Sequence, residues 1–219
     1  MKVIEIFGSI DGEGKRTGQL ATFIRLAGCN LRCCYCDTTY SFDCNKATEM
    51  SIDDIIDECI KIGYHNITLT GGEPLIHKDV KSLIINLCKE GFQVNIETNG
   101  SIDLQPFINL RKENNLDLFF TVDYKTKYSK MNHKMNINSF LNLDINKDIV
   151  KCVVANEDDM DDALEYLDKI GKFNIWFSPV FNEIEPKEIV EYVEKHFRED
   201  ITIQIQLHKI IWDPNKKGV

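Results

Sequence analysis

The residues best suited to do chemistry are three cysteines within eight positions, Cys29, Cys33 and Cys36, in a Cys-x3-Cys-x2-Cys pattern. Their thiolates can converge on one metal centre, and a [4Fe–4S] cluster is normally held by four thiolates. Three thiolates leave one iron open to a ligand from outside the protein, as catalytic zinc sites leave one coordination position open. The spacing therefore predicts an iron–sulfur site with a reactive corner.

Zinc is the alternative metal, with Cys44 as a fourth ligand eight residues beyond Cys36. Zinc knuckles usually use paired Cys-x2-Cys spacings, which this trio matches poorly. Cys34 could replace a neighbour as a ligand, although its spacing fits less well. Free cysteine packs as a small hydrophobe, and three cysteines on apolar stripes are expected in the core: Cys59, Cys88 and Cys152.

Composition narrows the possible classes of protein. The chain has 219 residues, a length that suits one domain. Its net charge of −9 argues against a basic surface for nucleic acid. No stretch approaches the roughly 20 apolar residues that span a bilayer, and no signal peptide is recognisable. We therefore expect a cytoplasmic protein without nucleic-acid or membrane partners, in which disulfides are rare and clustered cysteines bind metal.

Strand-like and helix-like runs alternate along the chain, a pattern typical of a parallel α/β sheet. One helix is expected between an N-cap at Ser51 and a stop at Gly63, and another runs from Val80 to Gly91. Weaker helical patterns cover 104–114, 157–170 and 186–197. The expected strands are 20–28, 66–70, 92–98, 118–123 and 201–208.

Most of these strands alternate between apolar and polar residues, as Ile67 and Leu69 do with Thr68 and Thr70. Successive side chains of a strand point to opposite faces, so one face packs helices and the other is polar. A solvent-exposed antiparallel sheet would explain the alternation, but the intervening helices favour a parallel sheet around a polar lumen. About six or seven strands fit, against eight in a closed barrel. We expect a partial, open (β/α) TIM-like barrel with its functional groups at the strand ends.

The motifs resemble those of the radical S-adenosylmethionine (SAM) superfamily. The three cysteines, with Tyr35 before the last, are similar to its signature, and Gly71-Gly72-Glu73-Pro74 is similar to its Gly-Gly-Glu-Pro motif. In that family the second motif meets the methionine amino group of SAM, which assigns the contact to Gly72 and Glu73. Two glycines let the backbone approach a ligand closely.

A finer resemblance is to the 7-carboxy-7-deazaguanine synthase family of the queuosine and 7-deazapurine pathway. It extends to both ends of the chain, is weakest between 124 and 200, and departs from the family at Asp11, where glutamine is usual. It implies a single domain over 1–219 with short N-terminal and C-terminal substrate-binding extensions, and a homodimer. The segments that carry it are 9–14, 23–32, 36–38, 70–74, 97–101 and 206–209.

The resemblance implies a carbon–nitrogen lyase that converts 6-carboxy-5,6,7,8-tetrahydropterin to 7-carboxy-7-deazaguanine with loss of ammonia, in a pathway that leads to tRNA modification. Its cofactors would be a [4Fe–4S] cluster, SAM and Mg²⁺, with flavodoxin or ferredoxin as electron donor. The cofactor performs the hard step and the protein positions it. We therefore expect no dedicated acid–base residues, and none is convincingly placed in the sequence.

The chemistry of Arg25 also makes it a candidate substrate-binding residue, because its guanidinium suits bidentate capture of the substrate carboxylate. A salt bridge with an acidic residue is the alternative. Thr38 matches the threonine that coordinates Mg²⁺ in the family, and otherwise its hydroxyl caps the backbone of a loop. By resemblance, the substrate-binding residues are Ile10, Asp11, Gly12, Glu13, Arg25, Thr70, His208 and Lys209.

The SAM contacts implied by the resemblance lie at strand ends. The family often has Ser-Pro-Lys where this chain has Asp123-Tyr124-Lys125, so an aspartate could accept the SAM ribose hydroxyls there. The following loop, 125–134, is locally basic, and is either a solvated loop or a contact for an anionic ligand or partner. The full set implied for SAM is Gly72, Glu73, Glu97, Asn99, Asp123, Lys125, Ser178 and Pro179.

Two other functions remain open at this stage. A small activase that makes a glycyl radical on a partner, such as anaerobic ribonucleotide reductase, would share the cysteine motif, but it would not need Arg25, Thr38 and the N-terminal loop as they stand. A non-enzymatic module stabilised by zinc on Cys29, Cys33, Cys36 and Cys44 would leave the Gly-Gly-Glu-Pro motif unexplained.

Overall fold

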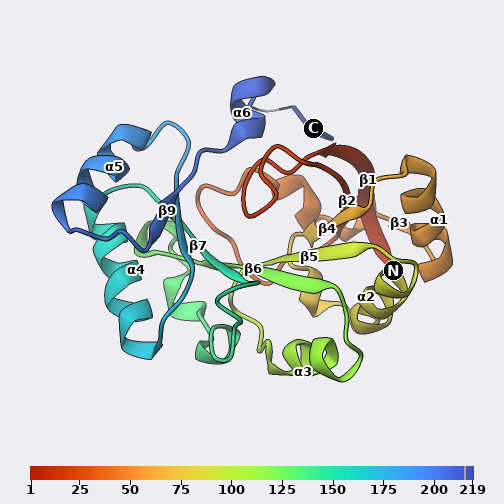
Figure 1. Ribbon diagram of the computed structural model, residues 1–219. Helices are drawn as coiled ribbons and strands as arrows, with labels where there is room; N and C mark the ends of the chain where they lie inside the picture. The colour runs from red at the N-terminus through yellow and green to blue at the C-terminus, as the bar shows by residue number, and fades with distance from the viewer. Residues whose placement is uncertain (215) are drawn as a thin grey trace.

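A single curved sheet organises the chain (Figure 1) in the computed structural model, which describes residues 1–214 and 216–219. Its nine strands lie in the order β3-β1-β2-β4-β5-β6-β7-β8-β9. Neighbours from β2 to β9 pair in parallel, whereas β1 pairs antiparallel with both β2 and β3. The strands are β1 Lys2–Ile10, β2 Leu20–Leu26, β3 Thr48–Glu49, β4 Asn66–Gly71, β5 Gln93–Thr98, β6 Leu118–Tyr124, β7 Ile149–Val154, β8 Ile175–Pro179 and β9 Ile201–Ile203.

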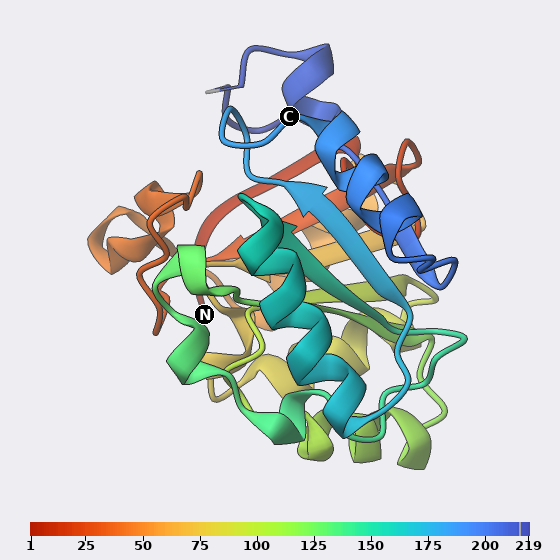
Figure 2. The ribbon, with the colours of Figure 1, turned by 90° about the vertical axis from the view of Figure 1, so that its left-hand side faces the viewer.

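The helices α1 to α5 cover the outside of the curve, whereas α6 lies apart from them near the C-terminus, as the two views in Figures 1 and 2 show. α1 begins after a capping box between Ser51 and Asp54 and ends at Gly63, whose φ of 83° is in the left-handed region. Local sequence therefore fixes both ends of this helix. The helices are α1 Ile52–Ile62, α2 Val80–Lys89, α3 Gln105–Glu113, α4 Glu157–Ile170, α5 Pro186–Lys195 and α6 Leu207–Ile211.

Seven parallel strands confirm the open (β/α) architecture and its strand number. The outer face holds fully buried apolar side chains such as Leu69 and Ile96. The inner face is polar and also buried, with Thr68 0% and Asn95 3% exposed. A solvent-exposed sheet is excluded, because the outer face is covered by helices and the inner-face residues Thr68 and Asn95 are buried. No helix within 1–214 and 216–219 is long and apolar enough to cross a membrane.

The expectation of a strand over 201–208 is wrong beyond residue 203. β9 ends at Ile203 and α6 begins at Leu207. The Gln204 side chain turns inward to accept from Gly14 N at 2.7 Å, and Leu207 N donates to Gly12 O at 3.0 Å. These contacts to the N-terminal loop draw the chain away from the sheet.

Two of the three cysteines expected in the core are fully buried, Cys59 and Cys152, whereas Cys88 is half-buried against it. The N-terminal strand β1 was not anticipated. It places Glu5 beside Arg25 in register and so extends the polar edge of the lumen.

Candidate active site

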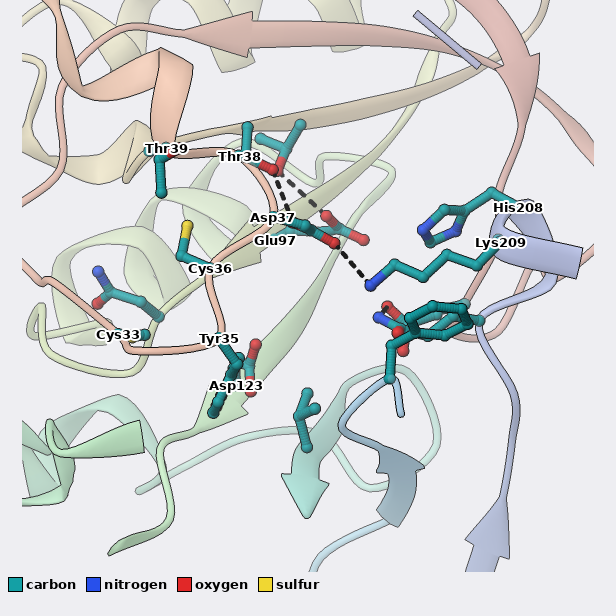
Figure 3. A pocket seen from close by; sticks show the side chains of 18 of the residues that line it. Cys33, Tyr35, Cys36, Asp37, Thr38, Thr39, Glu97, Asp123, His208 and Lys209 are labelled. Carbon is teal, nitrogen blue, oxygen red and sulfur yellow. Dashed lines mark hydrogen bonds and ion pairs between the residues drawn. The ribbon is translucent and has the colours of Figure 1, made fainter. Parts of the chain in front are cut away.

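A cavity of about 1160 Å³ lies where the parallel strands end. Residues after β2, β4, β5 and β6 line it, together with side chains of β7, the loop after β1 and the C-terminal segment (Figure 3). Most of the predicted site residues lie on this wall: Ile10, Gly12, Glu13, Arg25, Cys29, Cys33, Cys36, Thr38, Thr70, Gly72, Glu97, Asn99, Asp123, Lys125, His208 and Lys209. Four do not: Asp11, Glu73, Ser178 and Pro179.

The three cysteines of the motif lie together on the cavity wall, each partly exposed and unpaired. Cys29 Sγ accepts from Leu31 N at 3.4 Å and from Asn99 Nδ2 at 3.7 Å. Such N–H donors are typical around cluster thiolates. Burial raises the pKa of the Cys33 thiol to about 11, although Lys125 opposes the shift. A bound metal would favour the thiolate form. The donor set fits a three-thiolate iron–sulfur cluster.

The described residues show no grouping of the kind that a single zinc ion would need. Among residues 1–214 and 216–219, no three His, Cys, Asp or Glu side chains converge on one metal ion. Cys44 is not on the cavity wall, and its Sγ lies 3.3 Å from where a Cβ on Gly28 would stand. Cys34 Sγ instead donates to Tyr128 O at 2.9 Å. The described side chains therefore give no support to a zinc site that includes Cys44.

Gly72 lies on the cavity wall directly beside the first cysteine. A Cβ on Gly72 would lie 2.1 Å from Gly28 O and 2.7 Å from Cys29 Cβ. Only glycine lets the end of β4 lie this close to the end of β2. The Gly-Gly motif thus brings a bare backbone edge beside the cysteine loop.

Glu73, expected to contact SAM, instead lies in the protein interior and is 0% exposed. It accepts from Asn99 N at 2.7 Å, Thr98 Oγ1 at 2.9 Å and Leu75 N at 3.0 Å. Burial raises its pKa to about 7, although these hydrogen bonds oppose the shift. Its role is to hold Asn99 at the cavity, because the strand-end backbone turns its side chain inward.

Arg25 is fixed on the wall by one edge of its guanidinium. Its Nε donates to Glu5 Oε1 at 2.7 Å, and Tyr40 Oη donates to the same oxygen at 2.7 Å. No hydrogen bond from its two Nη atoms exists within the described part of the chain. The salt bridge weighed as an alternative is present, yet it leaves the bidentate edge available for a carboxylate.

Glu13 lies in a buried polar network. Lys151 Nζ lies 3.2 Å from it, Ser178 Oγ donates to it at 2.7 Å and Gln206 Nε2 at 3.4 Å. Burial alone would raise the pKa of Glu13, but Lys151 and Ser178 hold it below its ordinary value. Glu13 is therefore an ionised acceptor at neutral pH. Ser178, expected to contact SAM, is fully buried and supports Glu13, and Pro179 follows it off the wall.

Asp123 lies beside Tyr35 on the cysteine side of the cavity (Figure 3). Its Oδ2 pairs with Lys125 at 2.7 Å and with Lys151 at 3.9 Å. Its Oδ1 is buried and has no hydrogen-bond partner among the described residues, as is also true of Tyr35 Oη. An unsatisfied buried acceptor costs about 1–3 kcal/mol, so this oxygen is poised to accept from a ligand.

Asp37 connects the cysteine loop to α6, between Thr38 and Lys209 (Figure 3). Thr38 Oγ1 donates to Asp37 at 2.9 Å, and Lys209 Nζ lies 3.1 Å from it. Desolvation opposes ionisation here, but Lys209 and Thr38 lower the pKa of Asp37 to about 2. The Thr38 hydroxyl and the neighbouring Asp37 carboxylate thus place two hard oxygen donors at the cavity. Burial lowers the pKa of His208, so its imidazole is neutral at pH 7.

Asp11 was expected to bind substrate, but its side chain points beneath the cavity. It pairs with Arg16 at 2.9 Å and accepts from Thr68 Oγ1 at 2.6 Å. Its two neighbours Ile10 and Gly12 do line the cavity. The loop backbone alternates direction here, so the middle residue of the three faces the strands.

The basic loop 125–134 is partly at the cavity, where it could contact an anionic ligand, and partly in solvent. Lys125 and Lys130 line the cavity, whereas Lys127 pairs with Asp162 at 3.0 Å. His133 and Lys134 are exposed to solvent.

The sequence interpretation missed Glu5, Tyr40, Lys151 and Asp37. Lys151 had a signal, because it is the only charged residue of the otherwise apolar strand β7. Glu5 alternates with apolar residues in the same way in β1. The contact of Tyr40 with Glu5 and that of Asp37 with Lys209 join distant segments, and no local pattern predicts them.

Comparisons with known proteins agree with this geometry. The model of the Radical SAM superfamily matches residues 23–196. A 7-carboxy-7-deazaguanine synthase from Clostridium acetobutylicum is 42% identical over 223 residues, covering 100% of this chain and 99% of the relative. One of the same name from Chlorobaculum tepidum is 34% identical over 222 residues, covering 100% and 97%.

A solved structure has the same fold. The crystal structure of QueE from Escherichia coli has a TM-score of 0.73 to this chain at 24% identity, covering 94% of each. SuiB from Streptococcus suis bound to S-adenosylmethionine has a TM-score of 0.56 at 14% identity, over 81% of this chain and 45% of that one.

Proposed function

This chain belongs to the radical SAM superfamily and, within it, to the 7-carboxy-7-deazaguanine synthase family, and we propose that it converts 6-carboxy-5,6,7,8-tetrahydropterin to 7-carboxy-7-deazaguanine and ammonia. The observation that carries the proposal is one cavity with the three-cysteine loop on one side and the open edge of Arg25 on another. A SAM-dependent radical site and a carboxylate site would therefore share one space.

When bound, the cluster and SAM supply one-electron chemistry that removes a hydrogen atom from the substrate. Cys29, Cys33 and Cys36 would hold the cluster. Gly72 offers its backbone edge beside them. These residues bind and shield the cofactors, while the remaining wall places the substrate.

On the SAM side, the polar residues next to the cysteines would orient the cofactor. Asp123 Oδ1 is a buried acceptor in need of a donor, and a ribose hydroxyl is a suitable one. Asn99 contacts Cys29 and is held in place by Glu73. Lys125 holds the Asp123 side chain in place through their 2.7 Å contact.

On the substrate side, charge and hydrogen-bonding capacity suit a carboxylated pterin. Arg25 would bind the carboxylate through its two Nη atoms. Glu13 and Glu97 are carboxylate acceptors for the amino and N–H donors at the other end of the ring. Thr70 donates to Glu97 at 3.1 Å and fixes its direction.

Mg²⁺ is proposed as a third cofactor at Thr38. The hydroxyl of Thr38 and the carboxylate of Asp37 are oxygen donors of the kind that Mg²⁺ prefers, and the ion usually keeps waters and substrate oxygens as further ligands. Lys209 competes for the same carboxylate. His208 and Lys209 would close this side of the cavity.

Partners are proposed on chemical grounds. One-electron reduction of the cluster requires an external donor such as flavodoxin or ferredoxin, and a homodimer is the assembly that the family suggests. All eight cysteines are unpaired, which suits the reducing cytoplasm.

The experiment is anaerobic reconstitution with iron and sulfide, followed by incubation with SAM, dithionite, Mg²⁺ and 6-carboxy-5,6,7,8-tetrahydropterin. Mass spectrometry should detect 7-carboxy-7-deazaguanine and 5′-deoxyadenosine. A full cluster without deazaguanine product would contradict the proposal. A glycyl radical signal on added ribonucleotide reductase, without pterin turnover, would support the activase instead.

A further inference from the structure

A buried ion pair lies beneath the cavity, at the opposite end of the lumen. Arg16 Nε lies 2.9 Å from Asp11 Oδ2, and the two side chains are 5% and 3% exposed. Neither residue is among those that line the cavity. Because a buried ion pair gains little net stability over an apolar pair of similar size, stability alone does not account for its presence.

Arg16 fills the floor of the lumen. Its Nη2 donates to Ile67 O at 2.9 Å and to Thr68 Oγ1 at 2.7 Å, and its Nη1 donates to Gln93 O at 3.2 Å. Its guanidinium lies 5.2 Å from the centroid of the Phe119 ring. Since Ile67 and Gln93 stand at the amino-terminal ends of β4 and β5, Arg16 connects the starts of two neighbouring strands.

Asp11 fastens the loop 11–19 to that floor. Its Oδ1 accepts from Thr68 at 2.6 Å, so Thr68 contacts both members of the pair. Its backbone N donates to Gln19 O at 2.9 Å, and its carbonyl accepts from Gly18 N at 2.8 Å. Both arms of the loop are thus held by Asp11 and Arg16.

The residues between these anchors form part of the substrate side of the cavity. Gly12 and Glu13 line it. Gly12 O accepts from Leu207 N at 3.0 Å, and a Cβ on Gly12 would lie 2.2 Å from the His208 ring. A small shift of this loop would therefore move Glu13 and displace the segment that carries His208.

We infer that Asp11 and Arg16 are positioning residues, which set Glu13 and Gly12 against the substrate without touching it. The inference rests on the proposed function, because it concerns the pterin side of that same site. The cysteine loop is not held by this pair, since none of the hydrogen bonds of Asp11 and Arg16 within 1–214 and 216–219 reaches it. Substrate affinity should depend on the pair, and SAM affinity should not.

The test measures two dissociation constants on the reconstituted protein by calorimetry, one for the product 7-carboxy-7-deazaguanine and one for SAM. Arg16→Gln should raise the product Kd about tenfold or more, since small misplacements of binding groups are costly, while the SAM Kd stays within about twofold. Arg16→Lys, which keeps the charge but cannot reach both carbonyls, should lie between. The matched control is Lys15→Gln, because Lys15 is in the same loop but contacts the outer carbonyls of Asn146 and Lys147.

A double variant shows whether the two residues act as a pair. Asp11→Asn/Arg16→Gln should weaken product binding less than the two single changes combined, because no unpaired charge is left. A product Kd within twofold of wild type in both Arg16 variants, or equal losses for product and SAM, would overturn the inference. A wild-type protein that binds SAM but not the product would overturn the proposed function, and the inference with it.

Discussion

The floor of the lumen holds Asp11 and Arg16, and its rim, on the cavity wall, holds Arg25 and Asp123. Both regions are charged, but they differ in how many of their hydrogen-bonding atoms have partners within the chain. On the floor, Arg16 donates to Asp11, to Thr68 and to two backbone carbonyls, and it is 5% exposed. On the rim, Arg25 uses only its Nε, and Asp123 Oδ1 has no partner in the described part of the chain. The difference separates groups that hold the structure from groups that a ligand must complete.

The rim also differs in what its neighbours do. Glu5 and Tyr40 hold Arg25 from behind, Glu73 holds Asn99, and Ser178 holds Glu13. Fixed side chains with free hydrogen-bonding edges lose little entropy when a ligand binds. A floor whose hydrogen-bonding groups all have partners and a rim with free hydrogen-bonding groups are therefore the arrangement expected of a preorganised site.

The largest expected effect on activity is that of Cys33→Ala at the rim. We expect turnover to fall at least about a thousandfold, because a cluster normally needs all of its thiolate ligands, while the midpoint of thermal unfolding of the cluster-free protein changes little. Iron content and the visible absorbance near the cluster bands measure the loss. Cys34→Ala is the matched control, since Cys34 is exposed and its Sγ donates to the backbone of Tyr128. Retention of a full cluster by Cys33→Ala would refute the ligand assignment.

On the floor, we expect Asp11 to make the free energy of unfolding depend on pH. Burial raises the pKa of Asp11 to about 6, above the 3.8 of an unfolded chain, although Arg16 and Thr68 oppose the shift. Between pH 4 and 6 the folded protein thus keeps a proton that the unfolded chain has lost, and stability falls as pH rises. The shift corresponds to about 3 kcal/mol.

Asp11→Asn removes this titration. The free energy of unfolding of wild type minus that of Asp11→Asn should therefore decrease by about 3 kcal/mol from pH 4 to pH 6 and then stay level. Urea unfolding at several pH values provides the measurement, with Asp53→Asn on the exposed first turn of α1 as the control. A difference that is constant or increases with pH would contradict the account.

Arg25→Lys sharpens the assignment of the rim. Lysine cannot offer two parallel donors, so affinity for the carboxylated product should fall by about 2 kcal/mol, roughly thirtyfold. Affinity for 7-deazaguanine, which lacks the carboxylate, should change less than threefold. Isothermal titration of both ligands decides the point, and an equal loss for the two would mean that Arg25 does not bind the carboxylate.

The smallest expected effect is at Thr38. Thr38→Ala removes one oxygen donor among several, so activity should fall about tenfold and recover in part as Mg²⁺ is raised, since the ion keeps its water and substrate ligands. Thr39→Ala, on the neighbouring exposed position, is the control. Activity that is indifferent to Thr38→Ala at every Mg²⁺ concentration would remove it as a ligand.

Local patterns predicted most of the fold. Caps at Ser51 and Gly63 fixed one helix, and the alternation in 66–70 identified a strand with a polar inner face. The cysteine spacing and the paired glycines were also visible, because both are short-range requirements. Such features depend on residues close in sequence, where periodicity and turn chemistry are informative.

Side-chain direction at loops and strand ends could not be read in the same way. Glu73 and Asp11 lie within recognisable motifs, but backbone geometry turns Glu73 inward and Asp11 down to Arg16. The strand expected over 201–208 ended early because Gln204 and Leu207 bond to the N-terminal loop, nearly 200 residues away in sequence. These outcomes depend on tertiary contacts that override local preference.

In this interpretation, SAM and a carboxylated ligand complete the unsatisfied hydrogen-bonding groups of Arg25 and Asp123 on the rim. A crystal structure of the reconstituted protein with SAM and 7-carboxy-7-deazaguanine tests it most directly. We expect the carboxylate within hydrogen-bond distance of both Nη atoms of Arg25 and a ligand donor on Asp123 Oδ1, with Asp11 and Arg16 unmoved. A ligand whose carboxylate points away from Arg25, or an Asp123 Oδ1 still without a donor, would contradict it.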